Sequence, residues 1–151
     1  MNSVYSVLFL NPSTLEPLKL LSLSVNISAI QEWYKRHMEL KIDNVGPSVP
    51  CVHLTGRLDI LGTQAIDLKF TANTSAQRKS VIVDLSGVDF IASIGIRMLV
   101  TNAKALNALG HKLVLLQPQP KVEDMLKSTG IDTVIPIAND LDAAIKMITA
   151  E

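Results

Sequence analysis

The chain has 151 residues, of which 48% are hydrophobic and 19% are charged. This length and composition predict one globular domain, or one domain with an arm, and exclude a disordered chain. Fourteen Lys and Arg residues balance fourteen Asp and Glu residues. The sequence therefore lacks the basic excess that is typical of nucleic-acid-binding proteins.

Cysteine and histidine content argues against disulfides and metals. The single cysteine, Cys51, excludes an internal disulfide and a cysteine-based metal cluster. The three histidines, His37, His53 and His111, are scattered without the spacing of metal ligands. We therefore expect no metal and no cofactor, and a reducing cytoplasm as the location of the protein.

Segment 1–37 lacks a regular pattern. Its apolar start, MNSVYSVLFL, has no preceding positive charge and is soon followed by Pro12, which makes it a poor signal peptide. We expect an accessory strand or an arm that packs on the domain. An alternative stays open, in which Met38 is the native start and the preceding residues are an upstream in-frame extension.

The last part of this segment, about 28–37, has the pattern of a helix. Trp33 and Tyr34 in it could anchor the arm to the domain or to a second copy of the chain, which leaves a homodimer open. No stretch of the sequence has the roughly eighteen unbroken apolar residues of a membrane span.

From Met38 the pattern becomes regular. The segments MELKIDN and VPCVHLTGRLD predict two strands, the second ending at Gly56. The short GPS connection between them predicts an antiparallel hairpin. Apolar residues within 63–76 then predict a helix, and the bounded apolar run SVIVDLSG predicts a buried central strand.

Helices and strands alternate in the rest of the chain. The apolar spacing predicts a helix over 94–109 with Gly110 as its C-terminal glycine. The segment HKLVLLQP predicts a further strand. A short helix over 121–128 follows and ends at Gly130.

The last elements complete the predicted architecture. TVIPI predicts an edge strand that tolerates Pro136, and Asn139 or Asp140 caps a final helix that runs to about Thr149. Strands that alternate with helices imply a mostly parallel sheet. We predict an α/β fold with a mixed, mostly parallel sheet of four to five strands, an N-terminal antiparallel hairpin and about four covering helices.

Three segments resemble the STAS domain, the fold of bacterial anti-sigma-factor antagonists and of sulfate-transporter tails. They are LTGRLDILG (54–62), VIVDLSGVDFIASIGIRMLV (81–100) and GHKLVLLQPQPKVEDMLKSTGID (110–132). Their order and extent imply a STAS domain over 38–151, with 1–37 as an arm that the resemblance does not cover.

The resemblance singles out Ser93, which the pattern places between a strand and a helix. In antagonists of the family, the anti-sigma kinase phosphorylates a serine at this turn. A phosphate adds roughly −1.5 to −2 charges, which a helix N-terminus tolerates, so the expected effect is on partner binding. The other interpretation is that Ser93 only caps the helix. Ala92 and Ile94 replace the acidic and hydroxyl neighbours usual in the family, and both departures favour the cap.

The same resemblance implies a partner-binding face on two loops. Its residues are Gly56, Arg57 and Asp59 on the first loop, and Ala92, Ile94, Gly95 and Arg97 at the second. Asp59 could instead be an ordinary loop or capping residue. Asp84 and Asp89 flank the strand before Ser93 and are interpreted as turn-forming or partner-facing. We expect no catalytic residue, because no base or nucleophile accompanies these carboxylates in a catalytic arrangement.

By resemblance, the first functional hypothesis is an anti-sigma factor antagonist. It would bind a GHKL-type serine kinase that acts as an anti-sigma factor, lose that partner when Ser93 is phosphorylated, and be reset by a PPM-type phosphatase. A second hypothesis is a non-switching scaffold or ligand-binding subunit of a signalling complex or lipid transport system. An enzyme is the third and least supported class.

Overall fold

The computed structural model describes residues 28–29 and 38–150. Ser28 and Ala29 are helical. The predicted N-terminal strand, and Trp33 and Tyr34, for which an anchoring role was predicted, lie outside the described residues.

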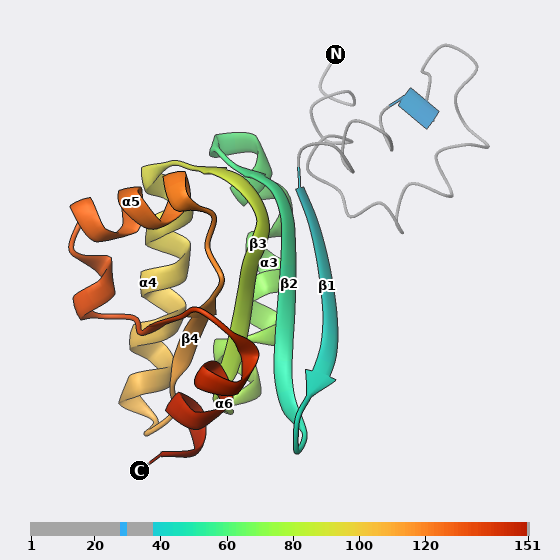
Figure 1. Cartoon of the computed structure of the whole chain (residues 1–151). Helices are drawn as coiled ribbons and strands as arrows, with labels where there is room; N and C mark the ends of the chain where they lie inside the picture. The colour runs from blue at the N-terminus through green and yellow to red at the C-terminus, as the bar shows by residue number, and fades with distance from the viewer. Residues whose placement is uncertain (1–27, 30–37, 151) are drawn as a thin grey trace.

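The described residues form a five-stranded sheet in the order β1-β2-β3-β4-β5 (Figure 1). The β1–β2 pair is antiparallel and the other pairs are parallel, which confirms the predicted fold class. The strands are β1 (Met38–Val45), β2 (Val49–Leu58), β3 (Val81–Ile91), β4 (Leu113–Leu116) and β5 (Ile137–Ala138). The helices are α3 (Ile60–Asn73), α4 (Ser93–Ala108), α5 (Pro120–Ser128) and α6 (Leu141–Thr149), with 3₁₀ turns η2 (Ser75–Gln77) and η3 (Ile131–Thr133).

Helices cover the two faces of the sheet unequally. The larger apolar cluster joins one face to α3, α4 and α5, whereas α6 packs on the other face in a smaller cluster (Figure 1). Alternation along β2 explains the division, because Val52 and Leu54 join the larger cluster while Val49 and Cys51 join the smaller one. None of the described helices is long and apolar enough to cross a membrane.

Two predicted boundaries next to the site were wrong. Strand β2 continues past Gly56 to Leu58, because its parallel pairing with β3 continues beyond an irregularity at that glycine. Gly56 has a φ of +118°, a conformation that side chains disfavour. Helix α3 begins at Ile60 rather than at residue 63, since Asp59 caps it there.

The C-terminal prediction was partly wrong. Of the proposed strand TVIPI, Ile137 pairs with β4, while Ile131–Thr133 forms a 3₁₀ turn. Pro136 accepts a hydrogen bond from Leu115 N–H through its carbonyl oxygen at 2.9 Å, but it has no N–H to extend the ladder. Capping of the last helix by Asp140 is confirmed, because its Oδ1 accepts from Ala143 N–H at 2.7 Å.

Candidate functional site

Strands β2 and β3 bring two loops together at their carboxyl ends. We call this end of the sheet the Ser93 edge. The two strands are parallel neighbours, and Leu58 pairs with Ile91 at their carboxyl ends. Ala92 N–H donates to the Leu58 carbonyl oxygen at 2.9 Å, which ties the second loop to the first. Asp59 follows the end of β2, and Ser93 lies two residues after the end of β3. The register of the two strands therefore places both residues at the same edge.

Ser93 is the first residue of α4 and does not cap it. The capping position is Ala92, which has an extended backbone and no side-chain oxygen, so the predicted cap role of Ser93 was wrong. Ser93 is exposed, and its hydroxyl has no hydrogen-bond partner among the described residues. The first backbone bond of the helix runs from Ile96 N–H to the Ala92 carbonyl oxygen at 3.1 Å. The three N–H groups before Ile96 therefore have no acceptor within the helix.

Asp59 is the capping residue of α3. Its Oδ1 accepts a hydrogen bond from Gly62 N–H at 2.8 Å. Its Oδ2 lies 3.6 Å from Arg57 Nε, and both side chains are partly exposed. A Cβ at Gly62 would lie 2.0 Å from the Arg57 carbonyl oxygen, so the turn needs glycine at that position. The carboxylate thus holds the helix start and also orders the arginine beside it.

An exposed apolar group surrounds this edge. Arg57 pairs with Phe90 across β2 and β3, and its Cζ lies 4.4 Å from the centre of the Phe90 ring. Phe90, Ile60 and Leu61 are 39%, 62% and 39% exposed. Sequence reasoning missed these three residues. For Ile60 and Leu61 a signal was available, because this apolar pair directly follows the Asp59 cap, where the first turn of a helix is usually acidic.

The other predicted residues of the second loop differ in accessibility. Ala92 and Ile94 are half-buried, whereas Arg97 is exposed. Gly95 is buried, and a Cβ there would lie 2.9 Å from the Leu58 Cβ. Gly95 therefore allows α4 to approach β2 closely and offers no side chain to a partner.

A hollow of about 330 Å³ lies between α3 and α4, next to the Ser93 edge. Ile94 and Arg97 line one side of it, and Asp67 lies on the other. Thr63 also lines it; this residue is 2% exposed, and its Oγ1 has no hydrogen-bond partner among the described residues.

Asp84 does not belong to the Ser93 edge. Its Oδ2 lies 2.8 Å from His53 Nδ1, and its Oδ1 accepts from Ser86 N–H at 2.9 Å. Burial raises the pKa of Asp84, but these hydrogen bonds lower it more, so the carboxylate form is favoured. Sequence reasoning missed this contact, because His53 and Asp84 are brought together by strand pairing and not by spacing along the chain.

Residues 25–144 match the STAS domain family model, and the chain belongs to that family. Among similar proteins is "Putative anti-sigma factor antagonist BtrV" of Bordetella bronchiseptica. It is 28% identical over 108 residues, which cover 71% of this chain and 91% of BtrV.

Solved structures of anti-sigma factor antagonists share the fold. One from Mycobacterium paratuberculosis superposes with a TM-score of 0.66 at 20% identity, covering 75% of this chain and 95% of that one. Unphosphorylated SpoIIAA gives a TM-score of 0.59 at 21% identity, covering 72% and 95% of the two chains. The phosphorylated form of Bacillus SpoIIAA gives 0.55 at 19% identity, covering 72% and 99%.

Proposed function

We propose that this protein is an anti-sigma factor antagonist that acts by binding. Its partner would be an anti-sigma factor of the GHKL serine kinase type, and binding would free the sigma factor. Family membership and the name of the relative BtrV support the class of partner. The protein would act in the bacterial cytoplasm and catalyse no reaction itself, with any ATP held by the kinase.

The observation that carries the proposed switch is the position of Ser93. Its hydroxyl is exposed at the first position of α4 and has no hydrogen bond to another described residue, so a kinase could reach it without breaking internal contacts. The start of the helix carries free N–H groups and a positive partial charge, which favour a phosphate. That SpoIIAA has a phosphorylated form of the same fold supports the same modification here.

The proposed contact surface surrounds this serine. Arg57 and Asp59 provide charge, and Phe90, Ile60 and Leu61 provide exposed apolar area. Arginine and aromatic side chains are enriched at protein interfaces, and arginine is among the residues that dominate binding energy. A phosphate on Ser93 would place a dianion at the centre of that surface and weaken binding of the same partner. A PPM-type phosphatase would remove it.

A second candidate is a non-switching STAS scaffold. The neighbours Ala92 and Ile94, which replace the family's acidic and hydroxyl residues, favour this alternative. In that case the edge would bind a partner constitutively, in a signalling complex or a lipid transport system.

Incubation with the cognate kinase and ATP, followed by peptide mapping, tests the switch. We expect phosphate on Ser93, no phosphate in Ser93→Ala, and normal phosphorylation in the control Ser128→Ala. Phosphate on another residue, or none, would leave the scaffold as the better account.

A further inference from the structure

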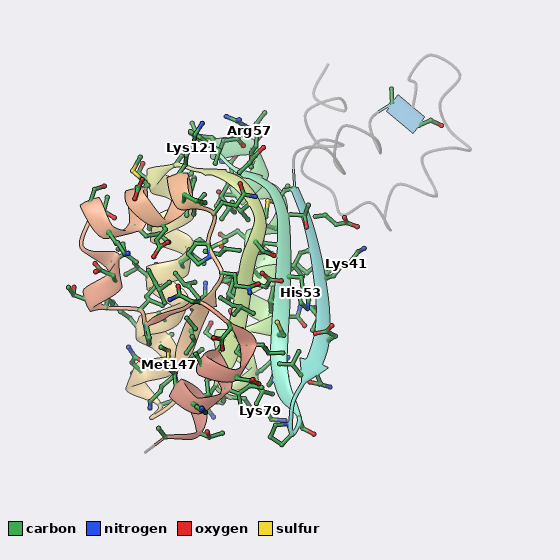
Figure 2. All side chains as sticks on the ribbon, viewed as in Figure 1. Lys41, His53, Arg57, Lys79, Lys121 and Met147 are labelled. Carbon is green, nitrogen blue, oxygen red and sulfur yellow. The ribbon has the colours of Figure 1, made fainter. Side chains whose placement is uncertain are left out.

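A second polar cluster lies on strands β1, β2 and β3, on the face of the sheet that carries α6. Antiparallel pairing sets Asp43 of β1 opposite Cys51 of β2, and His53 follows two residues later on the same face. One possible ligand atom from each of these three residues lies within 4.8 Å of the other two. Figure 2 shows His53 on β2, away from Arg57 at the edge described above.

The buried thiol is the first indication that this cluster could bind an ion. Cys51 is 0% exposed and free, and no described residue forms a hydrogen bond with its sulfur. Its sulfur lies within 4.8 Å of a possible ligand atom of Asp43 and of one of His53, so a divalent cation bound among them would give the buried sulfur a partner.

The orientation of the imidazole is the second indication. His53 Nδ1 lies 2.8 Å from Asp84 Oδ2, while Nε2 is directed toward Asp43 Oδ1 at 2.9 Å. Histidines that bind metals usually donate their other ring N–H to a carboxylate, which fixes the tautomer and the direction of the ligand nitrogen. Asp84 is placed to act in this way, which leaves Nε2 directed toward Asp43 as the ligand nitrogen.

We propose that Asp43, Cys51 and His53 bind Zn²⁺, with Asp84 as the residue that positions the imidazole. Thiolate, imidazole and carboxylate are all zinc ligands, and tetrahedral coordination sets such atoms about 3.3–3.6 Å apart. The observed spread of up to 4.8 Å needs only a small closure of side chains. Zinc would displace the thiol proton, and water would complete the coordination. The site is separate from the Ser93 edge, so it does not depend on the proposed function.

Titration of the full chain with Co²⁺ and then Zn²⁺ tests this site. We expect one Co²⁺ per chain, a near-ultraviolet thiolate-to-cobalt charge-transfer band, and loss of the band when Zn²⁺ is added. Cys51→Ser should remove the band and His53→Gln should weaken Zn²⁺ binding. Asp84→Asn keeps all three ligands but loses the orienting carboxylate, so it should weaken binding about 10–100-fold.

The matched control is His111→Gln, which removes a histidine outside the cluster and should bind Zn²⁺ like the wild type. The proposal is overturned if the wild type shows no charge-transfer band, or if His53→Gln and His111→Gln bind Zn²⁺ equally well. Circular dichroism without metal checks that each variant is folded. If Cys51→Ser does not fold, Asp43→Asn carries the test, because the Asp43 side chain is largely exposed.

Discussion

The guanidinium of Arg57 lies over the ring of Phe90, with Cζ 4.4 Å from the ring centre, where β2 and β3 approach their carboxyl ends. Both side chains are partly exposed, so this cation–π contact contributes only about 0.5–1 kcal/mol to stability. The contact also orients the arginine and the aromatic ring relative to each other within the surface proposed to bind the partner. A surface ordered in this way loses less conformational entropy when a partner binds.

We expect Arg57→Ala to weaken binding of the anti-sigma kinase by roughly tenfold or more, which corresponds to about 1.4 kcal/mol. The variant removes the arginine from the proposed surface while the fold stays intact. Isothermal titration calorimetry measures the affinity. Lys41→Ala is the control, since Lys41 is an exposed cation on the distant edge strand β1. Equal affinities of the two variants would contradict the proposed surface.

Asp59 and Asp140 form a matched pair of helix caps, with hydrogen bonds of 2.8 Å and 2.7 Å to backbone N–H groups. Replacement of either by Ala should lower the free energy of unfolding by about 0.5–2 kcal/mol, measured by urea denaturation. Asp59→Ala should also weaken kinase binding, whereas Asp140→Ala should leave it unchanged. If both variants lost affinity to the same extent, a general loss of stability would be the better explanation for Asp59.

Gly95 is required for packing. In Gly95→Ala the new methyl would meet Leu58 Cβ at 2.9 Å and the Leu58 carbonyl oxygen at 3.0 Å. Overpacking of this kind costs about 1–3 kcal/mol, offset in part by about 1 kcal/mol of improved helix propensity. We expect a net loss of stability in urea denaturation. The exposed control on the same helix, Thr101→Ala, should change stability by less than about 0.5 kcal/mol. A Gly95→Ala protein at least as stable as the wild type would show that α4 can move away from β2.

A negative charge at Ser93 should not unfold the protein. Because the residue begins α4, Ser93→Glu places the charge at the positive end of the helix, where such charges stabilise by about 0.3–1 kcal/mol. Ser93→Lys should have the opposite effect. Thermal denaturation at low ionic strength compares the two variants. A higher Tm for Ser93→Lys than for Ser93→Glu would contradict the dipole argument.

The sequence predicted the order of elements well, because glycine and proline punctuate it and the apolar periods are clear. It predicted the end of β2 poorly, because pairing with β3 carries that strand past the glycine at which it was expected to stop. Residue preference favours Ser93 as a cap of α4, which was one of its two interpretations, but the capping position is Ala92, whose N–H donates to the Leu58 carbonyl oxygen. The approach of His53 to Asp84 depends on strand register, which local spacing does not encode.

The most direct test of the account is calorimetric titration of the cognate anti-sigma kinase with two forms of the full chain, unmodified and phosphorylated at Ser93. We predict that the unmodified chain binds and that the phosphorylated chain binds at least tenfold more weakly, with the same circular dichroism spectrum. Equal affinity of the two forms would contradict the switch, and failure of the unmodified chain to bind would contradict the assignment of the partner.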